Sequence, residues 1–225
     1  MLSVGIDLGQ ARDATAIVAL ESYRPELQDR PEADTLPGQK VRARPRREVH
    51  HEITYIGRLR IGLSYPAQVE AIAGILDSLA GEERPRVAID ATGVGRPVVD
   101  LLRQGCLWPL TAVTITGANE VATRGQSVAV PKVELVTCLE VTLSGRRLHA
   151  APDLALAPEL DKELRSFSYE LSATGRPLYE GRGSHNDLVL ALCLALWLVE
   201  RGTPGEGFRS YMSEQIARRQ AAQPA

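Results

Sequence analysis

The sequence is poor in aromatic side chains and lysine, and these shortages limit the functions that it could have. Phe, Trp and Tyr together make up 4% of the 225 residues, too few for a platform on which the bases of single-stranded nucleic acid stack. The net charge of −2 gives no general positive field that would attract nucleic acid to the whole surface. The basic residues are almost all arginines, because only Lys40, Lys132 and Lys162 are lysines. Any binding of nucleic acid therefore needs a local group of arginines.

Cysteine and long apolar runs are also scarce. Cys106, Cys138 and Cys193 are odd in number and show neither CxxC nor zinc spacing, so they are expected to be reduced core residues of a reducing compartment. The most apolar run, residues 188–199, is shorter than the roughly 20 residues that span a bilayer. With no signal-peptide pattern at the start, the sequence predicts a soluble, cytoplasmic protein without a membrane partner.

Hydrophobic periodicity predicts one mixed α/β domain over residues 1–201 and a flexible polar tail over residues 202–225. An exposed, proline-rich excursion is expected over residues 24–48. Strands are predicted at residues 2–9, 15–23, 50–63, 86–90, 110–116 and 176–181, and helices at 66–81, 98–105, 132–147, 155–171 and 185–201. This order indicates a three-strand meander followed by parallel strands, with helices on both faces of a central sheet. A Rossmann domain is excluded, since the first strand is followed by another strand.

Three aspartates stand at the ends of predicted elements. Asp7 lies near the end of the first strand between Gly5 and Gly9, where backbone or ligand can approach closely. Asp90 ends the strand RVAID at the carboxyl edge where α/β proteins place ligands, and Asp187 lies in the first turn of the last helix. Each has an ordinary explanation, because aspartates at strand ends form turns or cap helices, and Asp187 complements the helix dipole.

The combination of the three acids is more informative than any one of them. If the strands with Asp7 and Asp90 are neighbours, their carboxylates meet at one sheet edge, and the last helix can bring Asp187 beside them. Three such carboxylates repel one another unless a cation neutralises them. Mg²⁺ and Mn²⁺ prefer oxygen ligands, and two ions about 3.5–4 Å apart suit phosphodiester hydrolysis. The sequence therefore predicts a site for two divalent ions.

Four segments also carry a family resemblance. GIDLG…DATAIVAL, VAIDATGVGRPVVDLL, VPKVELVTCLEVTLSGRRL and GSHNDLVLALCLALW resemble, in order and spacing, the nuclease domain of phage terminase large subunits. The resemblance extends over residues 3–200 and implies the ribonuclease H-like fold, shared with RuvC-type resolvases. It implies an endonuclease that cuts concatemeric viral DNA during packaging, with Asp7, Asp90 and Asp187 as catalytic metal ligands. Asp13, in the motif D-x-T, and His185 would be auxiliary residues, although a turn and a helix cap explain them equally well.

The sequence departs from the family pattern in two places. The family's His-Asp-Asp motif is here His185-Asn186-Asp187, so Asn186 offers one ion an oxygen without a charge. The phosphate loop GxxxxGK[ST] does not occur in the sequence. The sequence is therefore expected to be either an isolated nuclease domain or a stand-alone product, with the packaging ATPase and the portal protein that the resemblance implies as separate partners.

Double-stranded DNA is the substrate that the resemblance implies, and its backbone needs positive charge around the acids. The main candidates are Arg42, Arg44, Arg46 and Arg47 in the excursion, with Lys132; others are Arg58, Arg60, Arg146, Arg147 and Arg182. A solvated surface explains many of them equally well.

Alternative functions stay open at this point. The opening GIDLG also begins sugar kinases and actin-like ATPases, but those need a second domain and a second Gly-rich motif. A resolvase would be expected to be more basic. A prophage-derived module that binds DNA or docks a partner without catalysis is the alternative from another class, and Asn186 favours it.

Overall fold

The computed structural model describes residues 1–9, 13–25, 48–81, 84–93, 95–105, 108–125, 127–151, 153–171, 177–181 and 186–200. The strands are β1 (Leu2–Asp7), β2 (Ala16–Tyr23), β3 (His50–Arg58), β4 (Arg86–Asp90), β5 (Leu110–Thr116), β6 (Ala122–Arg124), β7 (Ser127–Pro131), β8 (Leu148–Ala150), β9 (Phe167–Leu171) and β10 (Pro177–Gly181). The helices are α1 (Tyr65–Leu79), α2 (Gly95–Gly105), α3 (Lys132–Ser144), α4 (Ala157–Ser166) and α5 (Asp187–Glu200).

An eight-stranded sheet has the order β6-β7-β5-β4-β1-β2-β3-β8, and β9 pairs with β10 in a separate small sheet. The predicted meander is confirmed, because β2 pairs antiparallel with both β1 and β3. Next to β1 follow β4, β5 and β7, all parallel to it. The carboxyl ends of these four strands therefore lie at one edge of the sheet.

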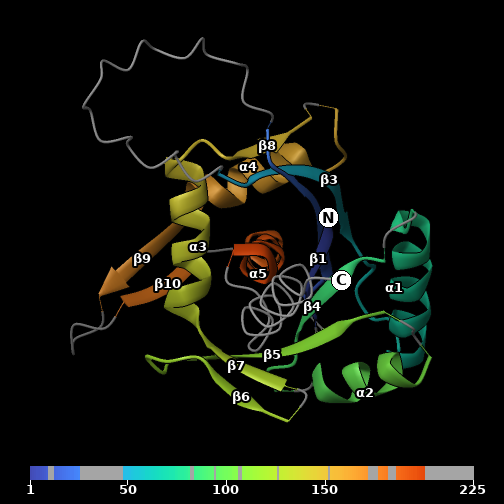
Figure 1. Cartoon of the computed structure of the whole chain (residues 1–225). Helices are drawn as coiled ribbons and strands as arrows, with labels where there is room; N and C mark the ends of the chain where they lie inside the picture. Colours follow the sequence, from blue (N-terminus) through green and yellow to red (C-terminus); the bar gives the residue numbers. More distant parts are fainter. Residues whose placement is uncertain are drawn as a thin grey trace, which may run out of the picture.

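Helices cover both faces of the sheet, as predicted. In Figure 1 the sheet curves around α5, which is seen end-on with α3 and α4 beside it, while α1 and α2 cover the outer face. Val4 and Ile6 of β1 pack in one core cluster with Ile72 of α1. Ala88 of β4 packs in the other cluster with residues of α5, such as Leu192. Successive residues of these strands thus serve opposite cores, as the pleat requires.

The glycines beside Asp7 admit protein backbone. A Cβ built at Gly5 would lie 1.9 Å from the carbonyl oxygen of Ala191 and 2.6 Å from the amide nitrogen of Ala195, both on α5. A Cβ at Gly9 would lie 2.2 Å from the carbonyl oxygen of Asp13. The expected close approach is therefore made by a helix and a loop rather than by a ligand. At Gly5 it brings α5, and with it Asp187, against β1.

Gly5→Ala is expected to destabilise the fold strongly, since the added methyl group fits only if α5 moves away from β1. Overpacking of this kind costs about 3 kcal/mol or more, which corresponds to a fall in Tm of about 6–12 °C for a chain of this size. Circular dichroism on heating measures it. The control is Gly74→Ala in the exposed part of α1, where a Cβ meets nothing within 4 Å. Equal Tm values for Gly5→Ala and wild type would contradict the packing of α5 on β1.

The predicted helix over residues 155–171 is wrong at its C-terminal end. α4 ends at Ser166, and Phe167–Leu171 forms β9, which pairs antiparallel with β10. The segment FSYEL suits a strand as well as a helix, and the partner strand decides. The sequence interpretation also missed β6, β7 and β8, which have three to five residues each.

Other predictions concern burial and membranes. Cys138 and Cys193 are buried free thiols, as predicted, while Cys106 lies outside the described residues. The same holds for the tail and for most of the excursion, residues 26–47. Among the described residues, no helix has both the length and the apolar character needed to cross a membrane.

Candidate active site at the acidic sheet edge

Two of the predicted acids lie side by side at the edge of the sheet. Asp7 is the last residue of β1 and Asp90 the last residue of β4. The two strands are parallel neighbours in a register that sets Ile6 opposite Ile89, so the aspartates that follow are also opposite each other. Both aspartates fall on the face covered by α5, whose first residue is Asp187.

The charges at this edge act on one another. The pKa of Asp7 is raised well above its ordinary value, first by burial and then by repulsion from four other acids: Asp90, Asp187, Asp13 and Glu163. Burial also raises the pKa of Asp90, although hydrogen bonds from Thr92 oppose the effect. We call these five acids the acidic edge. Its negative charges come from four separate parts of the chain and are brought together only by the fold.

Asp90 is held by Thr92. Its Oδ1 accepts hydrogen bonds from the Thr92 backbone N–H at 2.8 Å and from the Thr92 hydroxyl at 2.5 Å. The Thr92 Oγ1 in turn accepts from the backbone N–H of Ile115 in β5, at 2.9 Å. Asp90 therefore does form a turn, as the ordinary explanation predicts. The turn also fixes the Asp90 carboxylate, because Thr92 links it to the neighbouring parallel strand β5.

Glu163 is a member of the acidic edge that the sequence interpretation missed. It lies on α4, is 8% exposed, and its Oε2 accepts hydrogen bonds from the backbone N–H groups of Leu188 at 3.1 Å and Val189 at 3.3 Å. Its Oε1 pairs with the guanidinium of Arg58. Burial raises the pKa of Glu163, Arg58 lowers it, and Asp187 adds to the increase. One sequence signal could have found Glu163: it follows the apolar Leu160 by three residues, which places it on the buried face of α4.

The remaining predicted residues lie in different places. Asp13, a member of the acidic edge, is in the exposed loop that leads to β2. Asn186 directly precedes α5, and its carbonyl oxygen accepts from the N–H of Leu190 at 2.9 Å, which makes it the N-cap residue. Lys132 begins α3 immediately after β7, at the sheet edge shared with Asp90. His185 and the arginines Arg42, Arg44, Arg46 and Arg47 lie outside the described residues.

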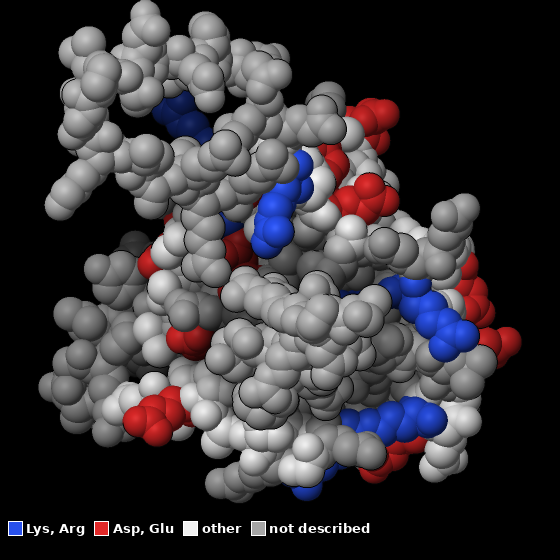
Figure 2. Space-filling view, in the orientation of Figure 1, with Lys and Arg blue, Asp and Glu red and all other residues white. Residues whose placement is uncertain are grey.

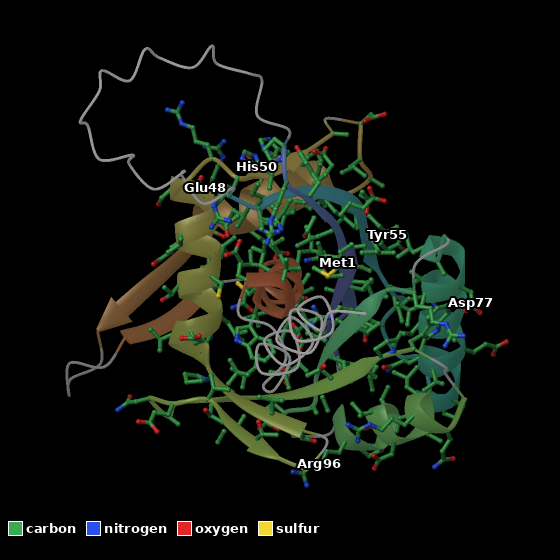
Figure 3. The ribbon with its side chains drawn as sticks, viewed as in Figure 1. Met1, Glu48, His50, Tyr55, Asp77 and Arg96 are labelled. Atoms are coloured by element: carbon green, nitrogen blue, oxygen red, sulfur yellow. The ribbon has the colours of Figure 1, made fainter. Side chains whose placement is uncertain are left out.

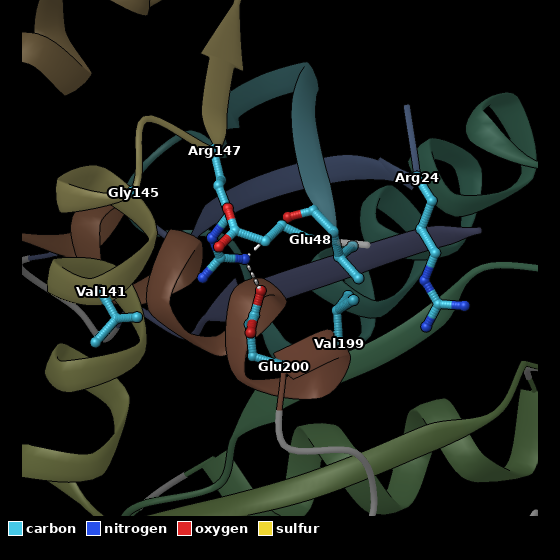
Figure 4. A pocket seen from close by; sticks show the side chains of 8 residues that line it. Arg24, Glu48, Val141, Gly145, Arg147, Val199 and Glu200 are labelled. Atoms are coloured by element: carbon cyan, nitrogen blue, oxygen red, sulfur yellow. Dashed lines mark hydrogen bonds and ion pairs between the residues drawn. The ribbon is translucent and has the colours of Figure 1, made fainter. Parts of the chain in front are cut away.

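Two of the further candidate DNA contacts have partners inside the fold. Arg58 pairs with Glu163, and Arg147, 7% exposed, pairs with Glu200 and donates to the carbonyl oxygen of Val49 at 2.9 Å. The pair of Arg147 and Glu200 borders an open pocket of about 540 Å³ at the end of α5 opposite Asp187 (Figure 4). The basic and acidic side chains visible among the described residues are interspersed on the face shown in Figure 2.

An exposed basic side chain follows Asp90 closely in the sequence. Arg96, in the first turn of α2, borders a hollow of about 260 Å³ together with Thr114 and Thr116 of β5. It lies on the opposite side of the molecule from His50 and Glu48 (Figure 3). The end of the molecule with Arg96 is therefore distinct from the end that holds the Arg147 pocket.

The donor chemistry of the acidic edge suits a hard divalent cation, since its side chains offer carboxylate oxygens whose mutual repulsion a cation would relieve. Within the described part of the chain, however, no three Asp, Glu, His or Cys side chains are gathered closely enough to hold a metal ion as they stand. Binding of an ion would therefore require the carboxylates to turn towards it.

No protein-family model matches the sequence, and no curated protein matches it in sequence. The fold is similar to solved nuclease domains. The large terminase nuclease from thermophilic phage G20c with bound magnesium has a TM-score of 0.55 and 17% identity, with 87% of this chain and 80% of that chain covered. The Thermus phage P74-26 large terminase nuclease domain has a TM-score of 0.53 and 17% identity, with 89% of this chain and 80% of that chain covered.

The human cytomegalovirus terminase nuclease domain, soaked with Mn, is also similar, with a TM-score of 0.51, 12% identity, and coverage of 88% of this chain and 83% of that chain. At such low identities the likeness concerns the fold. The central order β3-β2-β1-β4-β5, with β2 antiparallel, agrees with it. The chain thus has the mixed α/β, ribonuclease H-like fold of large terminase nuclease domains.

Proposed function

We propose that this chain is a divalent-metal-dependent DNA endonuclease of the terminase type. The observation that carries the proposal is the acidic edge: Asp7 and Asp90 lie side by side at the carboxyl ends of β1 and β4, and burial, followed by the charges of Asp90 and Asp187, raises the pKa of Asp7. Solved domains of the same fold are terminase nucleases, one with bound magnesium and one soaked with Mn. Two Mg²⁺ or Mn²⁺ ions, when bound, would supply charge stabilisation for hydrolysis of a phosphodiester bond.

The chain's own residues would hold the site in place. Asp7 is fixed at the end of a central strand, Asp90 is held by Thr92, and Asp187 stands on a helix whose residues are nearly all buried. The backbone that carries these side chains is thereby held in place, so binding of an ion requires only the carboxylates themselves to turn. Asn186, at the N-cap of α5, is a weaker candidate ligand because its amide oxygen has no charge. Asp13 and His185 are proposed to assist from the surrounding loops.

Double-stranded DNA is the proposed substrate. Lys132, at the same sheet edge, and the cluster Arg42, Arg44, Arg46 and Arg47 are proposed to contact its phosphates. In this role residues 1–201 are proposed to be the nuclease domain, and residues 202–225 to dock a separate packaging ATPase or portal protein. The place of action would be the cytoplasm of a phage-infected or lysogenic bacterium.

Cleavage of supercoiled plasmid tests the proposal. Wild-type protein with Mn²⁺ or Mg²⁺ should nick and linearise the plasmid, and EDTA should stop the reaction. Asp90→Asn should lower the rate about a hundredfold or more, as the loss of a group that stabilises transition-state charge does. Asp100→Asn, on the exposed side of α2, is the matched control and should cleave like wild type.

The second candidate function is a non-catalytic module that binds DNA or docks a partner. Asn186 favours it, because the position offers no charge to an ion. Plasmid that stays intact with every metal, while a gel shift still detects DNA binding, would replace the nuclease proposal with this one. Cleavage by Asp90→Asn at the wild-type rate would show instead that the proposed ligands are wrong.

A further inference from the structure

We propose that Glu163 is a positioning residue, which holds the first turn of α5 and thereby sets the place of Asp187 at the acidic edge, and that Arg58 holds Glu163 in turn. The inference rests on the proposed function, since Asp187 is a proposed metal ligand. It deepens that function by adding a second layer of residues behind the acids. The three residues come from β3, α4 and α5, which are far apart in the sequence.

The hydrogen bonds are specific to the turn that carries Asp187. The first N–H groups of a helix have no partner within the helix, and the Oε2 of Glu163 accepts from those of Leu188 and Val189. These are the two residues directly after Asp187. A displacement of the Glu163 carboxylate therefore displaces the backbone from which the Asp187 side chain projects.

Glu163 also takes over a role that Asp187 could otherwise fill. An aspartate in the first turn of a helix ordinarily complements the positive end of the dipole and turns towards nearby N–H groups. Here a carboxylate from another helix occupies two of those N–H groups. Glu163 therefore does part of the capping of α5, and the Asn186 carbonyl accepts the first helical hydrogen bond.

Arg58 explains how two carboxylates tolerate each other at one helix end. Glu163 is buried and electrostatically repelled by Asp187. The guanidinium of Arg58, from the end of β3, pairs with the Glu163 oxygen that does not face α5. A carboxylate in this position without a counter-charge would be costly. Arg58 therefore supplies the counter-charge at the Glu163 carboxylate and fixes its position beside the first turn of α5.

The test compares Glu163→Ala, Glu163→Gln and Arg58→Met with wild type by titration with Mn²⁺ alone, followed by electron paramagnetic resonance. Loss of residues that support metal ligands lowers metal affinity about 10–100-fold. We expect at least a tenfold loss for Glu163→Ala and a smaller one for Glu163→Gln, which keeps an acceptor oxygen. Asp161→Asn is the matched control, since its pair with Arg165 lies on the same helix but is exposed to solvent. It should bind Mn²⁺ like wild type.

Amide hydrogen exchange at Leu188 and Val189, measured with EDTA present, tests the hydrogen bonds from these residues to Glu163 without any metal. Exchange should be faster in Glu163→Ala and in Arg58→Met than in wild type. Unchanged exchange in a folded variant would overturn the proposal even if the protein is a nuclease. Faster exchange in the variants, in a protein that never binds Mn²⁺, would support the positioning role of Glu163 but refute the proposed function. If Glu163→Ala does not fold, the same readouts on Glu163→Gln decide, and wild-type exchange with wild-type Mn²⁺ affinity would overturn the proposal.

Discussion

Asp7→Asn is expected to raise the Tm of the metal-free protein at neutral pH and to abolish its cleavage of DNA. The Asp7 carboxylate is buried and repelled by the other acids of the acidic edge, so its charged form destabilises the fold. Asparagine keeps the shape and the acceptor oxygen but has no charge. Substitutions that remove an unfavourable charge commonly stabilise by about 0.5–2 kcal/mol, which corresponds to a rise in Tm of about 1–8 °C.

The effect of Asp7→Asn should depend on pH in a defined direction. Because the pKa of Asp7 in the folded protein is raised above 3.8, the carboxyl destabilises the fold only where it is charged, as pH rises through the raised value. The Tm difference between variant and wild type should thus be largest near pH 8 and vanish towards pH 3.8. Thermal unfolding in EDTA at several pH values measures it. A variant that is less stable than wild type at pH 8 would contradict the electrostatic account.

Arg147→Met is expected to destabilise the protein without affecting the acidic edge. Arg147 and His51 both bond to Glu200, and the Nε2 of His51 lies 2.9 Å from Oε1 of Glu200. Burial lowers the pKa of His51 and favours its neutral form. Arg147 is therefore the charged partner of Glu200 at neutral pH. Because Glu200 is only partly buried, we expect the loss of a hydrogen bond between charged groups, which costs about 1.5–3 kcal/mol and predicts a fall in Tm of about 3–12 °C.

The pH dependence of Arg147→Met follows from Glu200. Burial by itself would raise the pKa of Glu200, but the bonds from Arg147 and His51 outweigh it and lower the pKa. The stability that this pair contributes is present above pH 4.5 and is lost as pH falls through the lowered value. The difference in Tm should therefore shrink in acid. Arg165→Met, in the exposed pair with Asp161, is the control and should melt like wild type.

Plasmid cleavage by Arg147→Met tests whether the Glu200 end of α5 contributes to the functional site. Arg147 lies opposite Asp187 along the helix, so Arg147→Met should cut plasmid at the wild-type rate at temperatures where it is folded. A rate that falls tenfold in a fully folded variant would show that the pocket beside Glu200 belongs to the functional site.

Three members of the acidic edge, Asp7, Asp90 and Asp187, were predictable because each lies at an end of a regular element. Alternation in the short strands sets Asp7 and Asp90 on one face, and the unbroken apolar run after Asp187 predicts the buried helix. The pairing of β1 with β4 is only a condition at the level of the sequence, and the structure fulfils it. These signals are local, so they can be read without knowledge of the tertiary structure.

Glu163 could not be predicted in the same way, because its partners are distant in sequence. Arg58 is 105 residues away, and the N–H groups that Glu163 binds are backbone atoms, which every residue has. For the same reason the sequence interpretation took Arg58 for a possible DNA contact. The strands β8 and β9 were missed since short segments become strands only when a partner such as β3 or β10 lies beside them.

The central claim is that Asp7, Asp90 and Asp187 together hold divalent cations. Calorimetric titration of the wild type with Mn²⁺ at pH 7.5, compared with Asp7→Asn, tests it most directly. The account predicts a stoichiometry of two Mn²⁺ per chain for wild type and loss of at least one of these sites in Asp7→Asn. Identical titration curves for the two proteins, or a wild type that binds no Mn²⁺, would contradict it.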